Sequence, residues 1–190
     1  MKKLDSNLYA LPSTELAPKL LGKLLCVKNG DEIISLRITE TEAYFGEEDT
    51  ACHAHKGRTP RTEILYRKGG MVYVYLCYGI HSLMNIISGE ENHPEGVLIR
   101  GVEGYNGPGK LTKFMGIDRS FNGLSAVDSD RIWISDDGYE PGEIFTSPRI
   151  GVDYATEEYR VKPWRFYINI CYYKRKRLEA QTSRRFVFMY

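Results

Sequence analysis

The segment from residue 40 to residue 78 carries the side chains best suited to chemistry. Glu40, Glu42 and Tyr44 alternate along a predicted strand, so they share one of its faces. Two acids on one strand face are usually solvated. A carboxylate beside aromatic walls can instead activate water and exclude bulk solvent, as hydrolysis through a cationic transition state requires. Glu42 is therefore a candidate catalytic carboxylate, because aromatic residues follow closely in the chain.

Three potential metal ligands follow in the run Cys52-His53-Ala54-His55. Structural zinc sites commonly pair ligands across two separated knuckles, and catalytic zinc sites often use a helical H-E-x-x-H motif. Neither a second knuckle nor an H-x-E element is present. We therefore predict no metal, and expect these histidines to form hydrogen bonds within a polar loop.

A basic segment lies between the histidines and the tyrosine-rich strand. Arg58 and Arg61 flank Thr59-Pro60, and such a segment could contact phosphates. Charge alone equally allows a solvated face that pairs with the acidic residues at 47–49.

Strands and short helices must position these residues. Tyr73 and Tyr75 share one face of the strongest predicted strand, and Tyr78 falls near the tip of a β-hairpin. Strands are predicted at 23–27, 32–44, 71–78, 82–88, 97–102, 131–134 and 165–170, and helices at 13–21, 61–67 and 107–115. Strands that follow one another, rather than alternating with helices, favour an α+β antiparallel sheet over a doubly wound one.

Length and composition set outer limits on the function. A chain of 190 residues suits one domain, and a net charge of +1 does not by itself indicate a nucleic-acid partner. No long apolar run and no G-x-G-x-x-G or Walker A loop is present, so membrane insertion and nucleotide chemistry are not expected. The four cysteines (Cys26, Cys52, Cys77 and Cys171) form no C-x-x-C pair, which is typical of reduced thiols in a cytosolic protein.

The order of the motifs resembles the alkyladenine (3-methyladenine) DNA glycosylase family. The matching elements are Glu40-Thr41-Glu42-Ala43-Tyr44-Phe45-Gly46-x-x-Asp49, Ala51-x-His53, Thr59-Pro60-Arg61, Tyr73-Val74-Tyr75-x-x-Tyr78-Gly79, Met84-Asn85, Val97-Leu98-Ile99-Arg100, Gly107-Pro108-x-Lys110-Leu111, Pro148-Arg149-Ile150-Gly151 and Lys162-Pro163-x-Arg165-Phe166-Tyr167. They cover most of the chain in one fixed order. The resemblance implies a single α+β domain with a curved antiparallel sheet, surrounding helices and a protruding β-hairpin that inserts into DNA.

The resemblance also assigns roles to individual residues. Glu42 would activate water, Arg100 would hold that water, Tyr78 would fill the gap left by a flipped nucleotide, and Asn85 would reject normal guanine. The stacking walls around the base would be Tyr44, His53 and Tyr75. The expected contacts to the DNA backbone are Arg58, Arg61, Lys110 and Arg149.

These roles imply a monofunctional enzyme, because no lysine matches a nucleophile position. It would flip alkylated or otherwise damaged purines, of the 3-methyladenine and 7-methylguanine type, out of double-stranded DNA and hydrolyse the N-glycosidic bond. The electron-rich rings would favour a cationic base. We expect a monomer without metal or organic cofactor and without a membrane partner, in the cytoplasm near the nucleoid if bacterial, or in the nucleus if eukaryotic.

The family resemblance ends before the chain does. We place the glycosylase domain at 1–170 and a C-terminal tail of unassigned structure at 171–190. Two alternative functions are a catalytically idle DNA-binding module that probes shape, and a hydrolase of free nucleosides. Glu42 argues against the first, because an idle binder gains nothing from an acid near phosphates. Tyr78 and the basic segment argue against the second, because a nucleoside needs no wedge.

Overall fold

The computed structural model describes residues 2–169, so the tail predicted at 171–190 lies outside the described residues. Its strands are β1 (Lys2–Lys3), β2 (Leu24–Asn29), β3 (Glu32–Phe45), β4 (Val72–Cys77), β5 (His81–Ile87), β6 (Glu95–Val102), β7 (Tyr105–Asn106), β8 (Ile132–Asp136), β9 (Phe145–Ser147) and β10 (Arg165–Tyr167). Its helices are α1 (Ser6–Tyr9), α2 (Ser13–Leu20), α3 (Pro108–Met115) and α4 (Glu157–Arg160), with 3-10 turns η1 (His53–Lys56), η2 (Glu63–Tyr66) and η3 (Arg119–Phe121). Within this part of the chain, no helix is long and apolar enough to cross a membrane.

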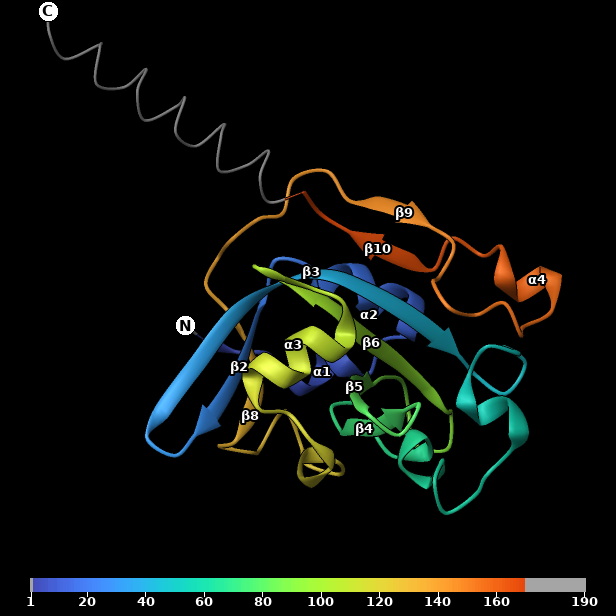
Figure 1. Cartoon of the computed structure of the whole chain (residues 1–190), viewed down its shortest axis with the longest axis horizontal. Helices are drawn as coiled ribbons and strands as arrows, with labels where there is room; N and C mark the ends of the chain where they lie inside the picture. The colour runs from blue at the N-terminus through green and yellow to red at the C-terminus, as the bar shows by residue number, and fades with distance from the viewer. Residues whose placement is uncertain (1, 170–190) are drawn as a thin grey trace, which may run out of the picture.

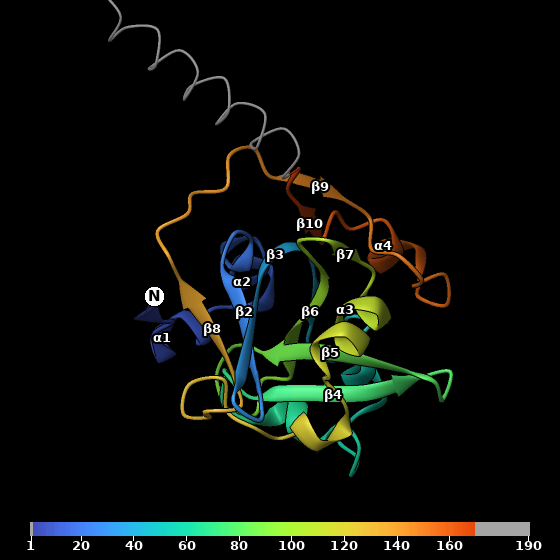
Figure 2. The same ribbon diagram turned by 60° about the vertical axis from the view of Figure 1, so that its left-hand side comes forward.

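All the strands join one open antiparallel sheet (Figure 1). The main order is β1-β8-β2-β3-β6-β5-β4, with β7 beside β6 and with β10 joining β3 to β9. The α+β fold class predicted from the sequence is therefore confirmed. In Figure 2, β4 and β5 run across the view while β2, β3 and β6 run up it, so the sheet is strongly twisted and curved.

Strand β3 is the spine of the sheet. Its first half pairs with β2 around a two-residue turn at Gly30-Asp31, where Gly30 has a φ of 62°. Its second half pairs with β6 on one edge and with β10 on the other. The strand is long and rich in Ile and Thr, so it suits an extended conformation. The second half of β3 is therefore hydrogen-bonded to a neighbouring strand on each side.

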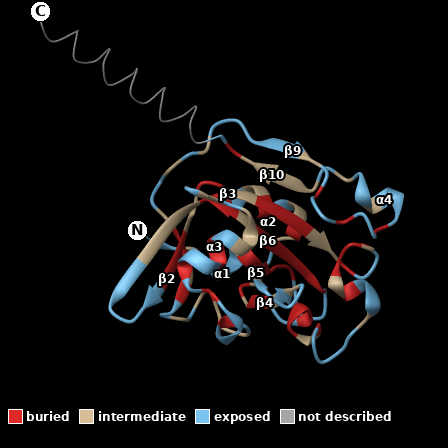
Figure 3. Ribbon diagram, viewed as in Figure 1, coloured by how far each residue is buried: buried red, intermediate tan, exposed pale blue. Residues whose placement is uncertain are grey.

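The main core lies on one face of this sheet, against α2. This helix buries the positions that recur every three to four residues, namely Ser13, Leu16, Ala17 and Leu20. The strand residues of the same core are aliphatic and fully or almost fully buried: Ile38, Ala43, Val72, Val74, Met84, Ile86, Val97, Ile99 and Val102. Figure 3 shows this buried centre along β3 and β6, with exposed residues at the outer turns. The side chains that alternate with these core residues project from the opposite face of the same strands.

Strands β4 and β5 form a hairpin that projects from the sheet. Their pairing runs from Val72↔Ile86 to Cys77↔His81, which leaves Tyr78-Gly79-Ile80 as the turn. Figure 2 shows the closed end of the hairpin extending beyond the neighbouring elements. The side chains of Tyr78 and Ile80 are 92% and 73% exposed. The fold therefore presents an aromatic side chain at the tip of a projecting two-stranded arm.

Candidate active site

Strand register places two of the candidate site residues, Glu42 and Asn85, in a single row. Glu42 pairs with Leu98, Leu98 pairs with Asn85, and Asn85 pairs with Tyr73. Directly paired residues in an antiparallel sheet project from the same face. The row therefore crosses β3, β6, β5 and β4 on the face opposite the main core. The neighbouring positions along the strands, such as Ala43, point the other way and fill that core.

The Glu42 carboxylate is fully buried and held by three groups. Its Oε1 accepts a hydrogen bond from the backbone N–H of Ile150 at 2.8 Å and lies 3.5 Å from Nε of Arg100. Its Oε2 accepts a hydrogen bond from the Tyr44 hydroxyl at 3.0 Å. The residue itself has no exposed surface. A neighbour on the same strand and two groups distant in sequence thus fix the orientation of one carboxylate.

A β-bulge brings Arg100 to this carboxylate. Glu40 pairs with Gly101 while Thr41 pairs with Ile99, so Arg100 is an extra residue on β6. Bulges of this kind bend a strand and redirect a side chain. Nε of Arg100 lies 2.9 Å from Oε1 of Glu40, in addition to its contact with Glu42. The prediction that Glu40 and Glu42 share one strand face agrees with this common partner.

Burial raises the pKa of Glu42 above its ordinary value. The positive charge of Arg100, the N–H of Ile150 and the Tyr44 hydroxyl act in the opposite direction, because each stabilises the ionised form. A carboxylate whose pKa is shifted towards neutrality is a stronger proton acceptor than an exposed one. The arrangement is suited to a general base.

Aromatic rings surround the approach to Glu42. The rings of His53 and Tyr75 meet edge to face, with centroids 4.5 Å apart, and Tyr73 lies against Tyr75 at 5.4 Å. His53 begins the short turn η1, and its Nδ1 is 3.0 Å from the Tyr73 hydroxyl. Burial, with Arg61 and Lys56 as further causes, lowers the pKa of His53 to about 4. The imidazole is therefore neutral at neutral pH.

A large open cleft lies above these rings. Its volume is about 1410 Å³, and Tyr44, His53, Tyr75, Leu98 and Arg100 line its floor and walls. An adjoining cavity of about 40 Å³ shares Tyr44, His53 and Tyr75 with the cleft and is lined by Tyr73 and Asn85 as well. It has room for water but not for a bicyclic purine. The structure thus brings Tyr44, His53, Tyr75 and Arg100 together at the cleft, with Glu42 and Asn85 just behind it.

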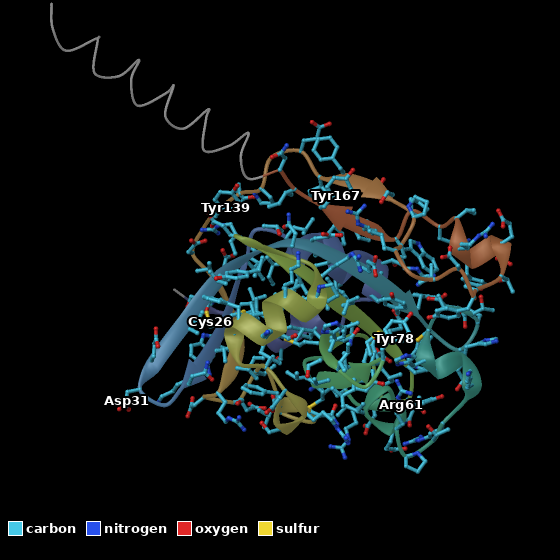
Figure 4. All side chains as sticks on the ribbon, viewed as in Figure 1. Cys26, Asp31, Arg61, Tyr78, Tyr139 and Tyr167 are labelled. Carbon is cyan, nitrogen blue, oxygen red and sulfur yellow. The ribbon has the colours of Figure 1, made fainter. Side chains whose placement is uncertain are left out.

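The tip of the hairpin also lines the cleft. Tyr78 has a φ of 50°, in the left-handed region that residues other than glycine seldom occupy, and it is followed by Gly79 with a φ of 73°. Strain of this kind costs about 1–3 kcal/mol and is concentrated at functional sites. Figure 4 places the labelled Tyr78 and Arg61 on the same side of the molecule, and both line the cleft.

The four expected DNA-backbone residues fall into two groups. Arg61 and Lys110 are exposed and line the cleft, and Arg61 lies 5.6 Å from the ring centre of Tyr75. Arg58 lies outside the cleft lining and forms an exposed ion pair with Glu63 at 2.7 Å.

Arg149 differs most from the sequence expectation. Its side chain is fully buried and forms an ion pair with Asp49, whose side chain is buried too. A guanidinium without exposed surface has nothing to offer a phosphate. Sequence reasoning also missed the backbone N–H of Ile150, although its motif Pro148-Arg149-Ile150-Gly151 was among those recognised, because a backbone contact leaves no side-chain signature.

No metal site is evident between residues 2 and 169, where no group of three or more His, Cys, Asp and Glu side chains is placed to hold an ion. The residues first considered as ligands have other partners. Nδ1 of His55 contacts the carbonyl oxygen of Glu47 at 2.8 Å, and Sγ of Cys52 accepts from the N–H of Ala54 at 3.4 Å.

Comparison with known proteins gives a consistent match along the chain. The model of the family described as "Methylpurine-DNA glycosylase (MPG)" matches residues 7–105 and 103–171. A "Putative 3-methyladenine DNA glycosylase" of Psychrobacter cryohalolentis is 43% identical over 186 residues, covering 82% of this chain and 86% of that protein. Proteins with the same printed name are 40% identical in Borrelia garinii subsp. bavariensis (87% of this chain, 95% of that protein) and 39% identical in Methanocella arvoryzae (88% and 92%).

Proposed function

This chain belongs to the methylpurine-DNA glycosylase family, and from that premise we propose that it removes damaged purines from duplex DNA by base flipping. Its general activity is that of a DNA glycosylase, a hydrolase of the N-glycosidic bond. The proposed substrates are alkylated purines of the 3-methyladenine and 7-methylguanine type. The proposed enzyme is a monomer that needs no metal or organic cofactor and leaves an abasic site without cutting the strand.

One observation carries the proposal: a buried carboxylate with a raised pKa lies directly behind a cleft walled by aromatic rings. The three groups that hold Glu42, namely Tyr44, Arg100 and Ile150, all line that cleft. A DNA-binding surface without chemistry gains nothing from burying a carboxylate at the cost of its hydration. The arrangement favours an enzyme over an idle binding module.

In the proposed reaction, Glu42 accepts a proton from a water molecule as the water oxygen attacks C1′ of the deoxyribose. The C1′–N bond breaks, and its electron pair leaves with the base. A base alkylated at N3 or N7 is cationic, so it departs as a neutral molecule. The negative charge of Glu42 also stabilises the positive charge that develops on the sugar. Arg100 would hold the water beside the carboxylate.

We place the flipped base in the large cleft, where it adjoins the smaller cavity. His53 and Tyr75 already touch each other, so no ring fits between them. They would form one wall, and Tyr44 the other. Tyrosine faces attract a cationic base by about 0.5–2 kcal/mol. A neutral His53 adds no repulsion, and its low pKa therefore suits a positively charged substrate.

Two residues would decide which nucleotide enters. Tyr78, at the tip of the β4–β5 hairpin, would fill the gap in the duplex after the nucleotide leaves. Asn85 donates a hydrogen bond to the carbonyl of Tyr73 at 3.3 Å, which fixes its amide beside the small cavity. There it would clash with the exocyclic amine of normal guanine. Arg61 and Lys110 would contact the DNA backbone from the cleft walls.

A panel of duplex oligonucleotides, each with a single damaged purine, tests the function. After incubation with the full chain, alkali cleaves the strand wherever a base has been lost. We expect cleavage after alkali for 7-methylguanine and 3-methyladenine, and an intact strand when alkali is omitted. Cleavage without alkali would refute the monofunctional mechanism. Binding without base release would leave the idle module as the function, and equal release from free nucleosides would favour a nucleoside hydrolase.

A further inference from the structure

Arg149 and Asp49 form a buried ion pair behind Glu42. Nη2 of Arg149 lies 2.8 Å from Oδ1 of Asp49, and its Nη1 lies 2.5 Å from Oδ2. Nη1 and Nη2 also donate to the carbonyl oxygens of Ala43 and Tyr159, at 2.9 and 3.1 Å. One guanidinium thus joins the loop after β3, strand β3 itself, and helix α4.

The same guanidinium packs between two aromatic rings. Its central carbon lies 4.7 Å from the ring centre of Tyr44 and 5.1 Å from that of Trp164. Tyr44 is therefore supported by a rigid planar group, while its hydroxyl donates to Glu42. The support comes from a residue that does not line the cleft.

The residue after Arg149 contacts the carboxylate itself. The N–H of Ile150 donates to Oε1 of Glu42 at 2.8 Å, and Ile150 is the next residue along the chain. Arg149 also binds the carbonyl of Ala43, which lies between Glu42 and Tyr44 in β3. The side chain of Arg149 thus ties its own segment, 148–151, to strand β3 at the place where the two meet.

We propose that the Asp49–Arg149 pair is a positioning device, which holds the N–H of Ile150 and the ring of Tyr44 against Glu42 and so fixes the catalytic carboxylate. The inference rests on the proposed role of Glu42 as general base. Asp49 is well placed for this task, because it also accepts hydrogen bonds from the N–H groups of Phe45 and Ala51, at 3.1 and 3.0 Å.

Stability alone gives a weak reason for such a pair. Two charges removed from water lose hydration, and replacing a buried ion pair with apolar residues is often neutral or stabilising. Unlike apolar residues, the pair fixes an orientation, because a bidentate arginine sets both its distance from the carboxylate and the plane of the guanidinium. We infer that the geometry at Glu42 is what the pair contributes.

The pH dependence of catalysis reports on this geometry. The charged and titratable groups around Glu42 are Glu40, Tyr44, Tyr75, Arg100, Arg149, Tyr154 and Arg165. The other six remain when Arg149 is replaced by lysine, which keeps the positive charge at position 149 but not the fork of donors. If the Ile150 N–H then moves away, the ionised form of Glu42 loses a donor and its pKa rises.

The experiment compares Arg149→Lys and Asp49→Asn with a matched control, Arg37→Lys. Arg37 forms a bidentate pair with Asp137 at 3.0 and 2.7 Å, donates to a backbone carbonyl, and stacks on Tyr139 at 4.1 Å, yet it does not line the cleft. Each full-length variant is mixed in excess with a duplex carrying one 7-methylguanine. Base release is followed in a single turnover across the pH range, with spontaneous loss subtracted, and duplex affinity and melting temperature are measured alongside.

We expect Arg149→Lys, which keeps the local charge, to lose base release from a higher pH than the wild type, with the acidic limb shifted by about one pH unit. For Asp49→Asn the lost negative charge acts on the pKa of Glu42 in the opposite direction, so the effect is expected in the plateau rate. The plateau rate should fall by about tenfold at unchanged duplex affinity. Arg37→Lys should lower the melting temperature without moving the limb. The inference is overturned if folded Arg149→Lys keeps the wild-type limb and folded Asp49→Asn keeps the wild-type plateau rate. A wild-type chain that releases no base would instead overturn the proposed function.

Discussion

Replacing Glu42 with glutamine separates chemistry from architecture at this site. Glutamine has nearly the same shape as glutamate. Its carbonyl oxygen can keep the hydrogen bond from the N–H of Ile150, which is 2.8 Å from Oε1 in the wild type, and the contact with Arg100. Its amide can donate to the Tyr44 hydroxyl, which then reverses its role. We therefore expect Glu42→Gln to fold with the site geometry intact.

The size of the effect follows from what is lost. An amide cannot accept the proton of water, and a positioned general base contributes about 10²- to 10⁴-fold to a rate. The loss of the negative charge beside the sugar adds to this, so base release should fall by at least about 10³-fold. At neutral pH, the variant should also unfold at a higher temperature. Burial raises the pKa of Glu42, so the folded state loses stability at pH values above the pKa that Glu42 has in the unfolded chain. The neutral amide does not ionise and so removes that cost.

The assay measures three quantities on the same preparation. Single-turnover release of 7-methylguanine gives the chemical rate, a fluorescence titration gives duplex affinity, and thermal melting gives stability. Glu40→Gln is the matched control, because Glu40 lies two residues away on the same strand face, contacts Arg100 at 2.9 Å, and does not line the cleft. We expect a smaller loss of rate for this control.

Two results would contradict this reasoning. A Glu42→Gln variant that still releases base at a rate near that of Glu40→Gln would show that another group activates the water. Loss of duplex affinity in step with the rate, together with a lower melting temperature, would show that Glu42 is structural.

Three further predictions concern the hairpin, the small cavity and the histidine. Tyr78→Ala should slow base release from a paired lesion by about 10- to 100-fold, because one stacking contact is lost. Parallel single-turnover assays should show a much smaller effect on a bulged lesion. Asn85→Ala should raise release of undamaged guanine by about tenfold while sparing 7-methylguanine, measured by chromatography of the free bases. The pKa of His53 is about 4 in the folded chain and 6.5 in the unfolded chain. Between these values the unfolded chain binds more protons, so stability should fall as pH falls from 7 to 5. His53 should account for about 1–2 kcal/mol of that fall, and denaturant unfolding of His53→Gln should show a shallower dependence.

Much of the fold followed from local patterns. The alternation along β3 and the run of Tyr and Val in β4 are local signals, and the structure has strands at these places. The helix α3 likewise begins after Gly107, with Pro108 in its first turn, and ends at Gly116 in the left-handed conformation. Such features depend on neighbours within a few residues, so one sequence suffices to predict them.

Most of the candidate site was reached through the motif resemblance. Residue types and alternation singled out Glu42, and the family pattern added Arg100 and Asn85, which no local signal distinguishes. That the side chains converge depends on the register of four strands and on the bulge at Arg100. Register is set by how core side chains pack across the whole sheet, and no short window of sequence contains that information.

The surroundings of Arg58 and Arg149 could not be predicted from residue type. By residue type alone, Arg58 and Arg149 were equally suitable for a phosphate, since every arginine carries the same charge. The tertiary structure pairs Arg58 with Glu63 at the surface and buries Arg149 against Asp49, a hundred residues earlier in the chain. The sequence by itself determined which chemical groups this protein has and where its longer strands lie. Only the folded chain decided which charges meet water and which meet each other, because burial and ion pairing depend on residues far apart in sequence.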